Sequence, residues 1–221
     1  MRRTRRCWPK WRGGHDDAPG PGRCGACRDA GCRPRAGAGC RRHPWRLVPP
    51  GETRTVAKSS LAVTAAGTWN RSTRRPTSRS EVWTRHGLGL GEIDFFVIPR
   101  GKPLFRERDK KKAPLPRFDP AMLPPDLVEW FRNTARIVTG GSLFETFDVR
   151  PATLAGYPGV AFGYSYTTVD DNLERLGLAR AAVIGGTLYL ITFDAPKLHY
   201  FDASVADVRA TMDSARFTAA R

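Results

Sequence analysis

No cysteine follows Cys40 in this 221-residue sequence. The later chain therefore has no disulfide and no thiolate-bound metal site, and it indicates no redox compartment. Long apolar runs are missing as well, because no stretch approaches the roughly 20 residues of a membrane span. The basic residues Arg2–Arg6 are not followed by the apolar run of about 7–15 residues that an export signal needs. The chain as written is therefore expected in the cytoplasm.

Branched aliphatic residues are almost absent from the first 50 positions, where Leu47 and Val48 are the only ones. Arg, Gly, Pro, Ala and Cys fill 37 of these positions. Such a segment buries too little apolar surface to offset an ordering entropy of about 1–2 kcal/mol per residue. We predict a disordered Arg-rich segment at 1–55, a domain at 56–217 and a tail at 218–221. A misread start or shifted frame is a hypothesis for residues 1–50.

Acidic residues are scarce only in the N-terminal part. Residues 1–58 contain fifteen Lys or Arg and four Asp or Glu, whereas residues 91–221 contain seventeen and sixteen. The net charge of +16 therefore lies mainly in the first 90 residues, and the C-terminal part does not imply a basic groove. An Arg-rich arm binds phosphates through counterion release alone, so nucleic-acid binding by this arm is an alternative function.

Apolar periodicity predicts an α+β domain, with a mainly antiparallel sheet of about six to seven strands flanked by two helices. The expected strands lie at 61–65, 81–85, 92–98, 143–149, 160–167, 178–184 and 187–193. Gly185-Gly186 is typical of a two-residue hairpin turn. The segments 92–98 and 187–193 are apolar on both faces, so both are expected to be inner strands. A helix at 126–138 is expected with Asp126 as its N-cap, and Ser204 is expected to cap the last helix. Leu127, Phe131, Ala135, Val138 and their neighbours Trp130 and Ile137 form the predicted buried face of the first helix.

No motif in the sequence assembles a reactive centre. Cys24, Cys27, Cys32 and Cys40 have partly zinc-like spacing, but the last interval is loose and no apolar residue between them could pack around a metal. The Gly87–Gly91 stretch precedes a strand rather than a helix, so it does not fit a dinucleotide-binding loop. We therefore predict a non-enzyme with no metal and no cofactor.

One aromatic region favours ligand binding. Alternation places Phe162, Tyr164 and Tyr166 on the same face of a strand, and His199 adjoins further aromatic residues. Two interpretations stay open, because these side chains form either an ordinary packed core or an open surface for an apolar ligand. The proline-rich connection at 99–125 is likewise either a solvated crossover or a functional loop.

Several short motifs resemble a group of uncharacterised bacterial cell-envelope proteins, mostly lipoproteins, with a PsbP-like fold. The matching stretches are Trp69-Asn70-Arg71, Glu81–Thr84, Gly101–Leu104, Thr187–Phe193, His199-Tyr200-Phe201 and Asp213–Phe217. The resemblance implies a non-catalytic accessory or ligand-binding domain of the envelope, with an envelope protein or a small apolar ligand as its partner. It also implies a lipidated N-terminal cysteine. Cys40 lacks both an upstream apolar region and a Leu three positions before it, so membrane tethering is expected only if the gene product carries another N-terminus.

Overall fold

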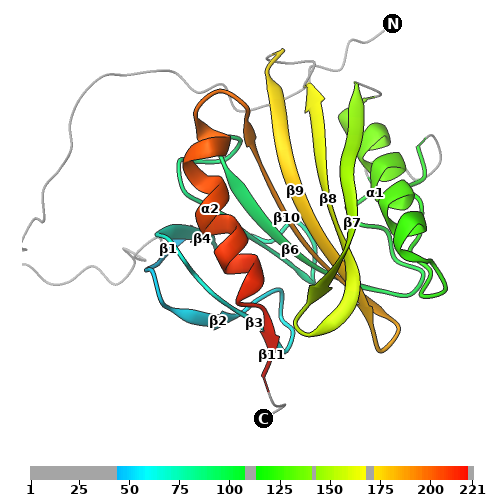
Figure 1. The fold of residues 1–221 in the computed structure, drawn as a ribbon, viewed down its shortest axis with the longest axis horizontal. Helices are drawn as coiled ribbons and strands as arrows, with labels where there is room; N and C mark the ends of the chain where they lie inside the picture. Colours follow the sequence, from blue (N-terminus) through cyan, green and yellow to red (C-terminus); the bar gives the residue numbers. More distant parts are fainter. Residues whose placement is uncertain (1–43, 108–112, 141–142, 168–171, 219–221) are drawn as a thin grey trace, which may run out of the picture. The chain divides into compact units, whose positions relative to one another are not determined.

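The computed structural model describes residues 44–107, 113–140, 143–167 and 172–218, which form an α+β fold of two antiparallel sheets and two helices (Figure 1). The larger sheet has eight strands in the spatial order β1 (Trp45–Val48), β4 (Trp69–Ser72), β5 (Ser80–Thr84), β6 (Glu92–Pro99), β10 (Thr187–Pro196), β9 (Glu174–Ile184), β8 (Tyr157–Thr167) and β7 (Phe144–Leu154). The smaller sheet consists of β11 (Arg216–Phe217), β3 (Leu61–Thr64) and β2 (Thr53–Thr55). The helices are α1 (Pro124–Thr139) and α2 (Tyr200–Asp213).

The two faces of the larger sheet bury separate apolar cores. On β6, Phe95 and its alternate neighbours pack with Val208 and Met212 of α2. Phe96 belongs to the other core, which includes Phe131 of α1. Alternation along one strand thus supplies both cores. The prediction that β6 and β10 are inner strands is confirmed, and Ile191 of β10 is fully buried.

Helix α1 begins two residues earlier than predicted. Its N-cap is Leu123, and Pro124 and Pro125 occupy the first two helical positions. Asp126 lies at the third position, where its Oδ2 accepts a hydrogen bond of 2.9 Å from the Leu123 backbone N–H. The prediction of Asp126 as N-cap is therefore wrong. Proline fits the first turn because the N–H that it lacks has no partner within the helix there.

Helix α2 also begins earlier than predicted, at Tyr200. Ser204 is buried within the helix and is not its N-cap, so this prediction is wrong as well. The first turn carries Tyr200 and Phe201, which pack against the core on the α2 side. The ring of Phe201 lies 5.7 Å from that of Phe193. Burial of these aromatic rings stabilises an additional helical turn ahead of the polar residues.

Ordered structure starts before residue 56, so the predicted boundary was too late. Strands β1 and β2 fall inside the segment 1–55 that was expected to be disordered, and the fully buried Val48 pairs with Trp69. The total of eleven described strands also exceeds the predicted six to seven. Strands of two to four residues, such as β2 and β11, are too short to show alternation in the sequence. The cysteine-rich part of the Arg-rich arm lies outside the described residues.

Candidate functional site

The three aromatic residues singled out from the sequence form packed core beneath α1. The ring centroid of Phe131 lies 5.3 Å from those of Phe162 and Tyr164. Phe144 stacks on Tyr164 at 5.5 Å and on Tyr166 at 5.7 Å. Because Phe162 and Tyr164 are buried, this face of β8 is not an open apolar surface.

His199 lies apart from those rings. It is the N-cap of α2, its φ is 68°, and its side chain is exposed. Its ring centroid is 5.5 Å from that of Tyr200, which also lies 5.4 Å from His86. Burial, together with the charges of Arg85 and His199, lowers the pKa of His86. The structure therefore does not bring His199 together with the three aromatic residues.

Three adjoining hollows surround Pro76 and Phe105 instead, and these two residues line all three. The volumes are about 760, 680 and 540 Å³. Phe105 belongs to the proline-rich connection, and its ring meets Phe96 of β6 edge-on at 5.6 Å. The only sequence feature that pointed to this region was the length of the proline-rich connection at 99–125. The sequence did not decide whether that connection is a solvated crossover or a functional loop.

The largest hollow, hereafter the basic groove, has five cationic side chains and an apolar floor. None of the described residues that line it is acidic. Its floor includes Phe96, Ile98 and Leu104. The cationic residues come from three separate segments, and they are Lys58, Arg75, Arg79, Lys102 and Arg106. The charge distribution along the sequence did not predict this groove.

Lys58 reaches the groove from a strained turn between β2 and β3. Ala57 and Lys58 have φ values of 52° and 53°, and the Ser59 N–H donates to the Val56 carbonyl at 3.0 Å. Two left-handed central residues characterise the hairpin turn that favours Asn-Gly. A left-handed residue other than glycine costs about 1–3 kcal/mol. The fold thus holds a lysine in the groove at a position where glycine would be more stable.

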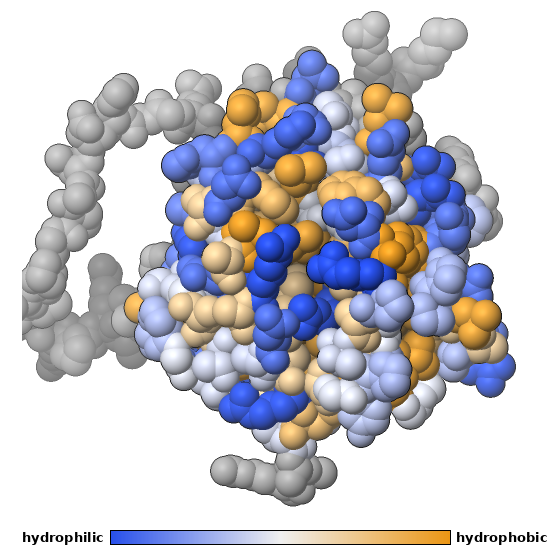
Figure 2. Space-filling model, in the orientation of Figure 1, coloured by the Kyte–Doolittle hydropathy of each residue, from blue (hydrophilic) through white to orange (hydrophobic). Residues whose placement is uncertain are grey.

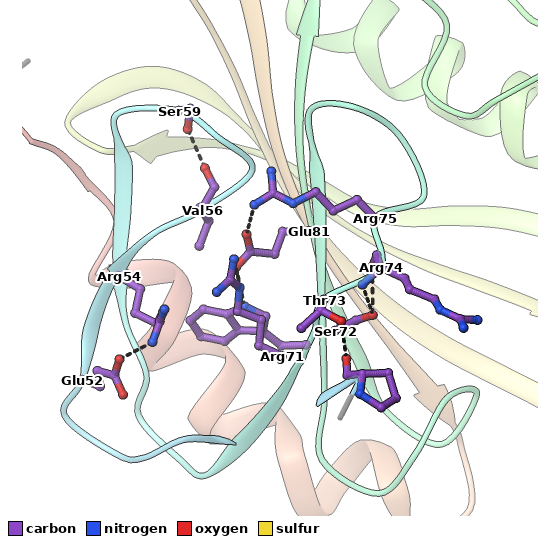
Figure 3. Close-up of polar contacts among 12 residues, drawn as sticks. Glu52, Arg54, Val56, Ser59, Arg71, Ser72, Thr73, Arg74, Arg75 and Glu81 are labelled. Carbon is purple, nitrogen blue, oxygen red and sulfur yellow. Dashed lines mark hydrogen bonds and ion pairs between the residues drawn. The ribbon is translucent and has the colours of Figure 1, made fainter. Parts of the chain in front are cut away.

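Arg75 is fixed by a buried carboxylate on β5 (Figure 3). Glu81 is fully buried, and its Oε1 lies 2.7 Å from Nε of Arg71 and accepts a 3.0 Å hydrogen bond from Nε1 of Trp83. Its Oε2 lies 3.4 Å from Nη2 of Arg75. Glu81 therefore connects the β4–β5 loop to the sheet and orients one cationic residue of the groove. The other four cationic residues form no ion pair with any described residue.

The hollow of about 540 Å³, hereafter the carboxylate groove, has charges of both signs, because Arg74 and Arg75 line it as well as two carboxylates. Glu92 and Asp94 of β6 line it together with Trp45. Burial raises the pKa of Asp94 well above its ordinary value, and the charges of Glu92 and Asp194 add to this effect. Burial also raises the pKa of Glu92 to about 6, with Asp194 contributing. Asp194 lies opposite Glu92 on β10 and accepts a 2.8 Å hydrogen bond from the Tyr166 hydroxyl.

A fourth hollow beside α2 is too small for a ligand. It has a volume of about 50 Å³ and is lined by Arg150, Arg180, Arg209 and Asp148 among others. This volume suits roughly one or two water molecules. Arg180 also pairs with Asp213 of α2 at 2.6 Å. Figure 2 shows strongly hydrophilic side chains among hydrophobic ones on this face, but the hollow offers no room for a larger molecule.

Two features are absent from the described part of the chain. No group of three or more His, Cys, Asp or Glu side chains is arranged there to hold a metal ion. The helices of that part are too short or too polar for any of them to cross a membrane. Cys24, Cys27, Cys32 and Cys40, whose spacing is partly zinc-like, lie outside the described residues.

Fold and site together define an α+β domain with a cationic groove on an apolar floor. No protein-family model matches the sequence, and no curated protein matches it. The solved structures with a similar backbone arrangement include the following three. Cyanobacterial PsbP (CyanoP) from Synechocystis is 14% identical with a TM-score of 0.48, covering 84% of this chain and 100% of that one.

Two further similar structures are LpqN, involved in cell envelope biogenesis of Mycobacterium tuberculosis, and the Ran-binding protein Mog1p of Saccharomyces cerevisiae. LpqN is 11% identical with a TM-score of 0.36, covering 81% of this chain and 94% of that one. Mog1p is 10% identical with a TM-score of 0.44, covering 78% and 95%. A PsbP is thus among the similar structures, as the motif resemblance implied, but likeness at this level assigns no ligand and no partner. Membership of the lipoprotein group stays a prediction.

Proposed function

We propose that this domain is a non-catalytic binding module that holds an anionic ligand in the basic groove. One observation carries the proposal: five cationic side chains surround an apolar floor, and no acidic residue is among the described lining. Cations gathered in a concave surface create a positive potential that concentrates anions. Arginine and lysine also donate charge-assisted hydrogen bonds to phosphate or carboxylate oxygens.

The groove is built to receive a ligand rather than merely to attract counterions. Its volume of about 760 Å³ falls within the roughly 300–1,000 Å³ typical of small-molecule sites. Glu81 holds the loop that carries Arg75 and Arg79, and a strained turn holds Lys58. Cationic groups fixed before binding lose less conformational freedom when the ligand arrives.

The proposal includes an accessory role in the bacterial cell envelope, which rests on the motif resemblance described from the sequence. An envelope protein or an envelope molecule is then the expected partner. Nucleic-acid binding through the Arg-rich arm is the alternative. The two functions can be distinguished with substitutions in the basic groove. Such substitutions should weaken groove binding, but they leave every residue of the arm in place and should not change binding by the arm.

The test is calorimetric titration of the full chain with glycerol 3-phosphate. Arg79→Ala with Lys102→Ala should weaken binding at least tenfold, since two charge-assisted contacts are lost. A charge-matched control is Arg132→Ala with Lys197→Ala, whose side chains pair with Glu129 and Glu174 away from the groove. Equal weakening in both double variants would indicate a general charge effect and contradict the proposal. Duplex DNA that binds all three proteins equally would support the arm instead.

A further inference from the structure

A second hollow shares Pro76, Phe105 and Arg106 with the basic groove, but the rest of its lining is mainly apolar. This hollow, hereafter the apolar groove, measures about 680 Å³ and is lined mainly by Pro76, Phe105, Leu115, Ile137 and Val138. Its acidic residue, Glu107, is neutralised, because Oε2 lies 3.3 Å from Nη2 of Arg117 and Oε1 accepts a 3.2 Å hydrogen bond from the Leu115 N–H. Arg106 lines both grooves.

Ile137 and Val138 are exposed where the sequence predicts burial. Both were placed on the buried face of α1, yet their side chains are 40% and 48% exposed. Earlier residues of the same helix, such as Phe131 and Ala135, are buried as predicted. The last turn of α1 therefore presents apolar surface toward the apolar groove instead of toward the sheet.

We infer that the anionic ligand is a single-chain amphiphile, with its charged head in the basic groove and its apolar chain across Phe105 in the apolar groove. The inference rests on the proposed function and names the class of ligand. Charge complementarity selects the head, because the described lining of the basic groove is cationic and free of acidic residues. A chain that covers Ile137 and Val138 removes exposed apolar surface from water, which stabilises the complex.

This arrangement makes affinity depend on chain length. Each methylene that enters an apolar site contributes about 0.8 kcal/mol, which corresponds to roughly a fourfold change in the dissociation constant. The dependence should end once the apolar groove is full. A free anion such as glycerol 3-phosphate shares the head but has no chain, so it should bind much more weakly.

The experiment titrates the full chain with glycerol 3-phosphate and with lysophosphatidic acids of increasing acyl length, each kept below its critical micelle concentration. We expect affinity to rise about fourfold per methylene and then level off. Ile137→Ser with Val138→Ser should abolish most of this rise and leave the affinity for glycerol 3-phosphate unchanged. The matched control is Leu47→Ser with Leu198→Ser, two exposed leucines that line neither groove.

The possible outcomes distinguish a failure of the amphiphile inference from a failure of the proposed anion-binding function. If glycerol 3-phosphate binds as tightly as the long-chain lipids, the amphiphile is excluded and an anion-binding groove remains. Binding to phosphatidic acid vesicles without binding to the monomeric lipids would likewise overturn the inference in favour of a membrane surface. If the groove variant Arg79→Ala with Lys102→Ala binds every probe like the parent chain, the proposed function itself fails.

Discussion

Glu81 and Asp94 lie on neighbouring strands of one sheet, yet their surroundings are opposite. Glu81 of β5 is fully buried and contacts Arg71, Arg75 and Trp83. Asp94 of β6 has the carboxylates of Glu92 and Asp194 as its charged neighbours, and its pKa is raised. Two arginines compensate the burial of Glu81, whereas the neighbouring carboxylates add to the cost that burial imposes on an ionised Asp94. Glu81 connects the β4–β5 loop to the sheet, whereas ionisation of Asp94 costs the domain stability.

The largest expected effect follows from removing the paired carboxylate. Glu81→Ala leaves Arg71 and Arg75 without their common partner, and breaking a buried ion pair in this way costs about 3–5 kcal/mol. A small domain has only about 5–15 kcal/mol of stability in total. Denaturant unfolding of the variant should therefore show a midpoint far below that of the parent chain. A loss below about 1 kcal/mol would mean that the two ion pairs do not hold the β4–β5 loop.

The change at Asp94 should have the opposite sign. Because the pKa of Asp94 is raised in the folded state, its stabilising contribution is greatest at acid pH and is lost as the pH rises through that pKa. Asp94→Asn keeps the side-chain shape and removes the charge. We expect a higher thermal midpoint at pH 7, and a smaller difference at pH 4. Equal melting curves for parent and variant at pH 7 would show that Asp94 bears no such cost.

Glu92 should give a smaller gain over a defined pH window. Its pKa rises from 4.5 to about 6, so the parent loses stability as the pH increases between these values. The shift corresponds to about 1–2 kcal/mol at neutral pH. Glu92→Gln should remove this loss, and melting curves at intervals from pH 4 to 7 would show it. A parent whose stability is flat across the window would contradict the prediction.

Removing an exposed ion pair should change the free energy of unfolding least, and this variant is the reference for the three larger effects. Nζ of Lys197 lies 2.8 Å from Oε2 of Glu174, and both side chains are about half exposed. Exposed pairs contribute about 0–1 kcal/mol. Lys197→Ala should therefore change the free energy of unfolding by no more than about 0.5 kcal/mol, measured by the same denaturant melts. A larger loss would mean that exposure does not distinguish this pair from Glu81 and its arginines.

The sequence was informative wherever structure depends on local periodicity. Alternation along β6 and β10 predicted inner strands, and the Gly185-Gly186 turn was confirmed between β9 and β10, with φ values of 57° and 75°. Helix starts were less accurate, because Pro124 and Tyr200 are favoured by a missing N–H and by aromatic packing respectively. In the sequence, a proline or an aromatic residue indicates a helix start less clearly than the polar capping residues that follow, Asp126 and Ser204.

The candidate site could not be predicted, because its residues meet only through the topology of the sheet. Lys58, Arg79 and Lys102 come from three separate connections, and the count of charges over long segments averages them with distant acidic residues. Asp94 alternates with Ile93 and Phe95 of the inner strand β6 and is half-buried, and nothing in the sequence singled it out.

At the turn of Ala57 and Lys58, the residue that supplies a cation for recognition is not the residue that would make the domain most stable. Lys58→Gly would relieve the strain at one of these two residues and leave Ala57, which is fully buried in the core, unchanged. Here the exchange would yield a sturdier domain that has lost one cation of its groove. A redesign guided by thermal resistance alone would therefore erase part of the recognition surface, and it would do so while every strand and helix stayed in place.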